Sequence, residues 1–261
     1  MMNEESKTKG KCLFCGKMYS IYGINRHLAL HLQEKVKSGE PGTSFLVKVV
    51  PDKNVWGESF PHFLSLWIDG EAFMDDFDSF LRKIWLECCH HGSAFRKNQK
   101  VNTSKYITDD FLDLPEFQQR MIFTKLGEEV EATEVYMEDE ANQVLQKGLK
   151  LKYVYDFGDK TQLIVTVIEQ YPMKADAAIV LLSRNEPLNE LCDNCGITPA
   201  TKMCTVCQWN GRDSMFCDPC AEKHASECEP FAEYASRLVV NSPRMGVCVY
   251  SGGSIDLERD R

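Results

Sequence analysis

The sequence predicts an α+β protein whose central domain has a largely antiparallel sheet with a packed amphipathic helix, flanked by small zinc-stabilised domains. Three observations predict this class. Short apolar, β-branched runs recur between residues 44 and 183, as in half-buried strands. One long segment there has apolar residues at helical spacing instead. Cysteine and histidine pairs at ligand spacing gather outside this region. The expected domains are 1–40, 41–186 and 187–261.

The first small domain has the ligand pattern of a C2H2 zinc finger. A C-x2-C pair is followed, after eleven residues, by an H-x3-H pair, one residue closer than usual. Histidines four apart lie on one helical face and can reach one ion. Tyr19 and Ile24 occupy the two positions that form the small core of such a finger. The expected zinc ligands are Cys12, Cys15, His27 and His31.

DNA reading by this finger is a separate question. Counting back from His27, the positions that contact bases are Ser20, Gly23 and Arg26. Arg26 suits a guanine edge, whereas Gly23 has no side chain and Ser20 accepts several bases. One finger covers only about three base pairs. The finger is therefore expected to act either as an auxiliary DNA clamp or as a protein-contact module.

A polar linker at 33–42 leads into the central domain, where alternating apolar runs predict strands. The clearest is a hairpin around the turn at 156–159. The segment 71–88 has one apolar face from Phe73 to Cys88, which predicts a helix packed on the sheet. The expected strands are 45–50, 63–68, 149–155, 162–168 and 177–183, and further helices are expected at 113–127 and 139–147.

Two stretches of this domain resemble a known family. The block WIDGEAFMDDFDSFLRKIWLECCHHGSAF and the hairpin YVYDFGDKTQLIVTVIE are similar to the plasmid pRiA4b Orf-3-like family. The resemblance covers about 44–186, and NSPRMGVCVYSG at 241–252 is similar to the tail of zinc-bearing members. It implies an α+β fold without an established reaction, and a link to mobile elements for some members. Where members usually read C-C-G-H, this chain has His90 in place of the glycine.

The C-terminal part carries eight ligands in four pairs, which predicts two closed, structural zinc sites. In the interleaved order, the first and third pairs share one ion and the second and fourth share the other. A sequential order is the alternative. The spacing resembles B-box-like double-zinc modules, and Trp209, Phe216 and Pro219 are candidates for a contact surface. The ligands are Cys192, Cys195, Cys204, Cys207, Cys217, Cys220, His224 and Cys228.

Two further groups suggest a ligand site in the central domain. Asp156 and Asp159 could hold a divalent cation, although the motif favours an Asx-type turn with Gly158 at positive φ. Cys88, Cys89 and His91 could bind a further metal or form a thiolate–imidazole pair. No fourth ligand is apparent for them, so buried structural cysteines are the favoured interpretation. Cys248 is left without a pair and is expected to pack against the zinc module.

Charge and composition bound the location and the partners. The chain has a net charge of −9, but residues 1–40 carry seven Lys and Arg against four Asp and Glu. Nucleic-acid contact is therefore expected at that end. The longest apolar run is too short to cross a bilayer, and the first residues do not read as a secretory signal. Cysteines in ligand pairs indicate a reducing compartment, so a cytoplasmic protein is expected.

Two functions from different classes follow. The favoured one is an interaction protein with three zinc ions, which binds DNA or another protein through its zinc modules and has no membrane partner. The alternative is an enzyme whose site lies near Asp156, Asp159 and the turn from Cys88 to His91. The Asp-Phe-Gly sequence alone does not indicate a kinase, because the other kinase motifs do not accompany it.

Overall fold

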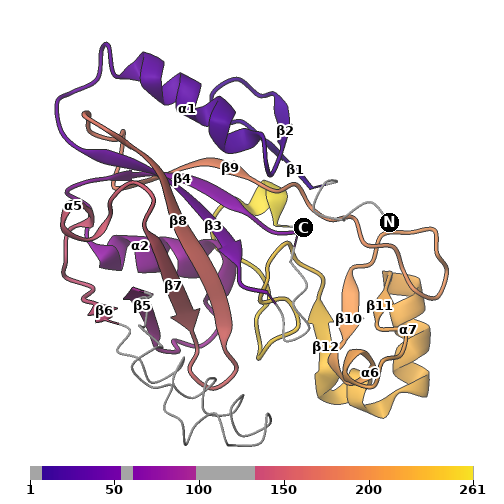
Figure 1. The fold of residues 1–261 in the computed structure, drawn as a ribbon. Coiled ribbons are helices and arrows are strands. Elements are labelled where there is room, and N and C mark those ends of the chain that lie inside the picture. Colours follow the sequence, from indigo (N-terminus) through magenta and orange to yellow (C-terminus); the bar gives the residue numbers. More distant parts are fainter. Residues whose placement is uncertain (1–7, 54–60, 98–132, 261) are drawn as a thin grey trace, which may run out of the picture.

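The computed structural model describes residues 8–53, 61–97 and 133–260. The α+β class is confirmed: the central domain is built on a seven-stranded sheet whose neighbouring strands all pair antiparallel (Figure 1). The helix expected at 113–127 lies outside the described residues. In sheet order the strands are β6 (Thr133–Val135), β5 (Ser93–Lys97), β7 (Lys150–Tyr155), β8 (Thr161–Tyr171), β3 (Ser44–Pro51), β4 (Leu64–Asp69) and β9 (Ile179–Arg184).

Every strand expected in the central domain is present, and two strands of its sheet were missed. β5 and β6 extend the sheet beyond the β7–β8 hairpin. β5 has one buried apolar residue, Phe95, among partly exposed neighbours, and β6 has only three residues. Such short edge strands carry too little periodicity to be recognised from sequence.

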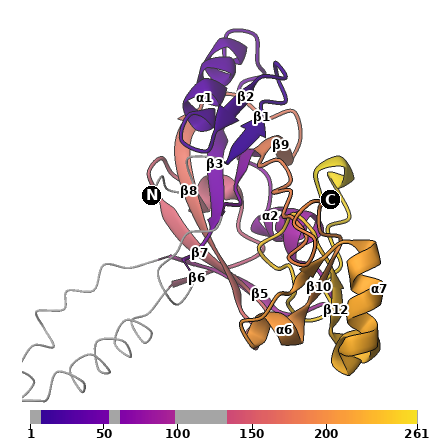
Figure 2. The same cartoon turned by 90° about the vertical axis from the view of Figure 1, so that its right-hand side faces the viewer.

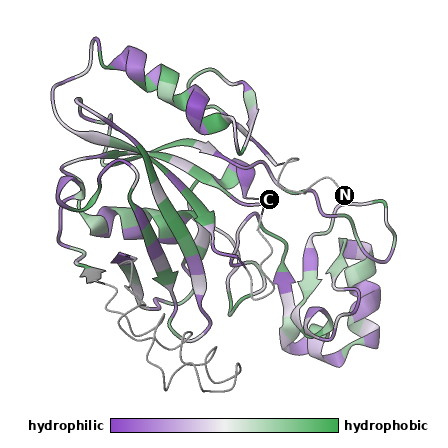
Figure 3. Ribbon diagram, viewed as in Figure 1, coloured by the Kyte–Doolittle hydropathy of each residue, from purple (hydrophilic) through white to green (hydrophobic). Residues whose placement is uncertain are grey.

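The sheet is covered on both faces, because successive side chains of a strand point to opposite sides. In β3, Phe45, Val47 and Val49 join the main core, whereas Leu46 faces the second core. Trp67 of β4 also faces the second core. The strands are accordingly coloured mainly as hydrophobic in Figure 3.

The main core lies between the sheet and a helix that follows β4. α2 (Met74–Leu81) continues into a π-helical turn, η2 (Arg82–Leu86), so the helix expected at 71–88 is shorter at both ends. Phe73 was expected on the buried face but is half-exposed. It precedes the helix, where its N–H donates to the Asp76 carboxylate. The expected helix at 139–147 is reduced to one turn, α5 (Ala141–Val144).

The finger covers the opposite face of the sheet. It consists of β1 (Lys9–Lys11), β2 (Met18–Ser20) and α1 (Ile24–Lys35), and α1 lies across the sheet at the top of Figure 2. Ile24, Leu28 and Leu32 are fully buried in the second core, together with residues of β3 and β4. The finger is thus packed on the central sheet through a shared apolar core.

The second zinc-type module forms a separate small body, orange in Figure 1. Its core consists largely of its own cysteines with Phe216 and Phe231. The chain then returns along the central domain and ends there at η5 (Leu257–Arg259). Within the described ranges, no helix is both long and apolar enough to cross a membrane. The elements of the module are β10 (Lys202–Cys204), α6 (Thr205–Trp209), β11 (Met215–Phe216), α7 (Asp218–Glu227), η4 (Phe231–Ala235) and β12 (Ser236–Leu238).

Candidate metal centres

The finger brings its four expected ligands together. After β1 the chain turns at Gly16, whose N–H donates to the Cys12 carbonyl over 2.8 Å at a φ of 73°. α1 supplies the two histidines one turn apart, with 3.1 Å between their Nε2 atoms. The Cys15 Sγ lies 3.2 Å from the His27 Nε2. All four ligand atoms lie within 4.8 Å of one another, which suits a single metal ion. The residues are Cys12, Cys15, His27 and His31.

The first cluster of the C-terminal module repeats this turn. The Gly196 N–H donates to the Cys192 carbonyl over 2.8 Å, again at positive φ. The opposite pair begins α7, and the Cys195 and Cys217 sulfurs are 3.9 Å apart. Backbone N–H groups at Thr198 and then Ile197 lower the pKa of the Cys195 thiol to about 6. The cluster comprises Cys192, Cys195, Cys217 and Cys220.

The second cluster joins the start of α6 to the end of α7. The Cys207 Sγ lies 3.5 Å from the Nε2 of His224, and Phe216 stacks on that imidazole at 4.3 Å between ring centroids. Burial raises the pKa of the Cys207 thiol to about 12, so metal binding here releases a proton. The four residues are Cys204, Cys207, His224 and Cys228. The two clusters therefore have the interleaved order, not the sequential one.

The turn after η2 contains a fourth cluster that the sequence only partly suggested. The Cys89 Sγ is 3.0 Å from the His91 Nε2, and Cys88 and Cys248 complete the group within 4.8 Å. Cys248 was expected to pack against the zinc module, but its thiol lies beside this turn of the central domain. The contact between Cys89 and Cys248 could not be recognised from the sequence, because the two residues are far apart in the chain. The available signal was the one cysteine of the C-terminal part without an assigned pair, together with the unassigned Cys88 and Cys89.

Asp156 forms the expected Asx-type turn in the β7–β8 hairpin. Its Oδ1 accepts the N–H groups of Gly158 and Asp159 at 3.0 and 3.2 Å. The left-handed residue is Asp156, with a φ of 64°, and not Gly158 as expected. A carboxylate that accepts backbone N–H groups stabilises this conformation in Asp.

The Asp156 carboxylate also forms an ion pair with the buried guanidinium of Arg244. Burial opposes its charge, but a hydrogen bond of 2.7 Å from the Arg244 guanidinium lowers the pKa of the carboxyl. Asp159 is exposed, and its backbone carbonyl accepts another N–H of Arg244 at 3.0 Å. The pair therefore serves the hairpin and the docking of Arg244. The Asp156 Oδ2 also lies 3.3 Å from the Nε2 of His91, so the structure brings the Asp156 turn and the turn from Cys88 to His91 together, as the enzyme hypothesis requires, although Arg244 already pairs with the carboxylate.

The finger does not present its DNA-reading positions as a free helix face. α1 begins at Ile24, so Ser20 and Gly23 precede the helix, and the Ser20 Oγ accepts the Gly23 N–H at 3.3 Å. Asn25, at the start of α1, is buried and accepts a hydrogen bond from Ser65 of β4. Arg26 is exposed. Of the expected contacts, Arg26 alone presents a long side chain to solvent.

The three candidate contact residues of the C-terminal module have different positions. Trp209, at the end of α6, is 91% exposed, whereas Phe216 is buried over the second cluster. Pro219 is exposed in the first turn of α7. Phe216 therefore covers the metal ligands, and Trp209 and Pro219 remain available for contact.

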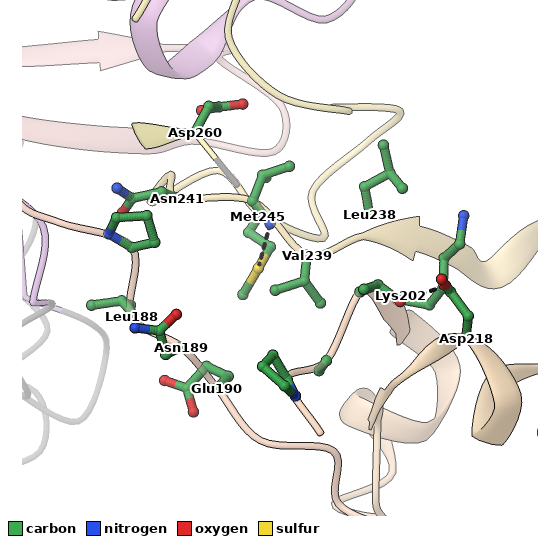
Figure 4. Close-up of a pocket in the computed structure, with 15 residues that line it drawn as sticks. Leu188, Asn189, Glu190, Lys202, Asp218, Leu238, Val239, Asn241, Met245 and Asp260 are labelled. Atoms are coloured by element: carbon green, nitrogen blue, oxygen red, sulfur yellow. Dashed lines mark hydrogen bonds between the residues drawn. The ribbon is translucent and has the colours of Figure 1, made fainter. Parts of the chain in front are cut away.

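A cavity of about 420 Å³ separates the module from the chain that leads into it (Figure 4). Leu188, Asn189 and Glu190 line one side, and Leu238 and Val239 line another. None of the cluster ligands lines it. The cavity lies between the module and the chain segment before it, and its lining offers no converging set of catalytic side chains.

Comparison with known proteins identifies no family. No family model matches the chain, and no curated protein sequence does so either. One crystal structure, of a protein of unknown function from Methanosarcina mazei Go1, aligns at 13% identity over 54% of this chain and 67% of that one, with a TM-score of 0.33.

Proposed function

We propose that the protein is a cytoplasmic zinc-binding interaction protein, with one zinc ion in the finger and two in the C-terminal module. The observation that supports this most directly is the three Cys and His clusters whose ligand atoms converge. With four protein ligands, each zinc site is closed and structural, because a catalytic zinc keeps a position open for water or substrate.

Nucleic acid is one partner class for this proposal. The finger end is the basic part of an acidic chain, and Arg26 is exposed on α1. Because the finger is fixed to the sheet, its contact is expected to be electrostatic and auxiliary rather than base-specific.

Another protein is the second partner class, and the C-terminal module supports it. An indole that is 91% exposed is unusual for a soluble surface, and Trp209 sits on the helix that carries Cys207. Tryptophan is enriched among residues that dominate protein interfaces. The resemblance to the pRiA4b Orf-3-like family adds the proposal that these contacts serve a mobile element.

Fluorescence anisotropy with labelled duplex DNA and single-stranded RNA at two salt concentrations tests the nucleic-acid arm. Binding should weaken with salt, and R26A should weaken it more than K37A, which removes an exposed charge beyond the end of α1. Absence of salt-sensitive binding by the wild type would contradict this arm. Partner capture with wild type and W209A then tests the protein arm, which requires loss of a specific partner in the variant.

A further inference from the structure

The cluster in the central domain joins segments that are far apart in the chain. Cys88, Cys89 and His91 follow η2, whereas Cys248 lies in the returning C-terminal segment. Their ligand atoms lie within 4.8 Å of one another, the same limit that the other three clusters meet. The fourth cluster is thus as convergent as the finger and the module.

Three of the separations are close to the edges of a zinc tetrahedron, and the fourth, 3.0 Å between the Cys89 Sγ and the His91 Nε2, is shorter. Zinc lies about 2.3 Å from sulfur and about 2.0 Å from nitrogen, which gives S···S edges of about 3.8 Å and S···N edges of about 3.5 Å. The Cys89 Sγ is 3.7 Å from that of Cys88 and 3.6 Å from that of Cys248. The Cys248 Sγ is 3.7 Å from the His91 Nε2.

The surroundings also suit a set of three thiolates. Three thiolates and Zn²⁺ carry a net charge of −1. The fully buried Arg244 places its Nη2 3.5 Å from the Cys88 Sγ while it pairs with Asp156. This cation lies between the Cys88 sulfur and the Asp156 carboxylate, whose Oδ2 is 3.3 Å from the His91 Nε2, and the Tyr155 hydroxyl lies 4.0 Å from the same sulfur. Such outer partners orient ligands and tune a metal site.

The local backbone is shaped to aim the ligands inward. His90, between two of them, has a φ of 62° and points outward, and its N–H donates to Glu87 at 2.6 Å. Cys248 also has a left-handed backbone, with a φ of 53°. Non-glycine residues adopt this region rarely and at a cost, so the surrounding contacts must hold both turns in place.

We propose that Cys88, Cys89, His91 and Cys248 bind a fourth zinc ion, which fastens the C-terminal segment to the central sheet. This goes beyond the interaction function and does not depend on it. The site is closed, with a soft Cys3His ligand set that suits zinc. The competing arrangement for two thiols 3.6 Å apart is a disulfide between Cys89 and Cys248.

Native mass spectrometry of the full chain, purified without added chelator or reductant, tests the proposal. We expect four zinc ions per wild-type chain and three in C248S. V249S changes the exposed neighbouring residue and should retain four. Zinc counts that did not differ between wild type and C248S, or a wild-type chain lighter by two hydrogens because of a Cys89–Cys248 disulfide, would overturn the proposal.

Cysteine alkylation of the wild type keeps the test independent of variant folding. Peptides with Cys89 and Cys248 should resist alkylation until a chelator is added, although the Cys89 side chain is exposed. Immediate alkylation of both before chelation would also overturn the proposal. Nucleic-acid or partner binding has no part in either readout, and the alkylation of Cys89 and Cys248 does not depend on how many ions the finger and the module hold.

Discussion

The finger and the C-terminal module both bring four metal ligands together, but they differ in how much apolar packing with the rest of the molecule supports them. The finger buries Ile24, Leu28 and Leu32 against the central sheet. The module instead has a core built mainly from its own metal ligands, with few larger apolar side chains. The same ligand chemistry therefore adds to an existing apolar core in the finger, whereas it forms most of the core of the C-terminal module.

This difference teaches that ligand spacing predicts a metal site but not how much of the fold depends on it. A segment with an apolar face packed on a large core keeps part of its stabilisation when the metal is lost. A small domain without such a core has the metal as its main source of folding free energy.

Metal loss should give the largest effect and the sharpest test of this contrast. C204S should unfold the module, because apparent zinc binding free energies of about 10–16 kcal/mol stabilise such small domains. C12S should leave α1 largely protected, since its apolar face remains on the sheet. Hydrogen exchange of each variant reports both regions. Equal loss of protection in the finger and in the module would break the comparison.

Loss of the buried ion pair between Asp156 of the sheet and Arg244 of the C-terminal segment should have the next largest effect on stability. D156A leaves the buried Arg244 without its 2.7 Å ion-pair partner, which is expected to cost about 3–5 kcal/mol. D159A, at the exposed end of the same turn, should change stability by less than about 0.5 kcal/mol. Denaturant unfolding compares them. A stable D156A protein that had lost a ligand or an activity would instead favour a functional carboxylate pair.

A cavity in the apolar core between α1 and the sheet should lower the stability by a comparable or smaller amount. L28A empties a fully buried position between α1 and the sheet, with an expected cost of about 2–5 kcal/mol. L30A, on the same helix but 62% exposed, is the matched control and should be nearly neutral. If chemical denaturation showed both variants to be alike, the finger would not depend on the sheet.

The most gradual effect is a pH dependence at His62, a buried histidine whose pKa responds to the charge of Arg184. Burial, and then the charge of Arg184, lower the pKa of this imidazole to about 3. Between its unfolded pKa of about 6.5 and that value, the unfolded chain binds a proton that the folded one does not. The free energy of unfolding should therefore fall as pH falls, by about 1.4 kcal/mol per unit below pH 6.5.

Comparison of wild type with H62L isolates this contribution from other titrating groups. The stability difference between the two proteins should change over pH 6 to 4 with the slope given above, and it should be constant above pH 7. A difference that stayed constant throughout would show that His62 titrates normally when folded.

Much of the central sheet could be predicted because its strands bury alternate residues. The hairpin of β7 and β8 and the strands β3, β4 and β9 all carry this pattern. β5 and β6 were missed because they are short and join the sheet through long-range pairing. The prediction that Gly158 has positive φ was also wrong. Asp156 takes the left-handed conformation instead, because local turn chemistry allows either residue to do so.

The sequence by itself determined which residues can bind metal, since ligand type and spacing within a turn or a helix are local properties. It identified the cysteine and histidine pairs of the finger and of the module. Only the tertiary structure decided the interleaved pairing, the burial of the finger helix and the approach of Cys248 to Cys89. These depend on contacts between distant segments, which packing of the whole chain selects and local patterns do not encode.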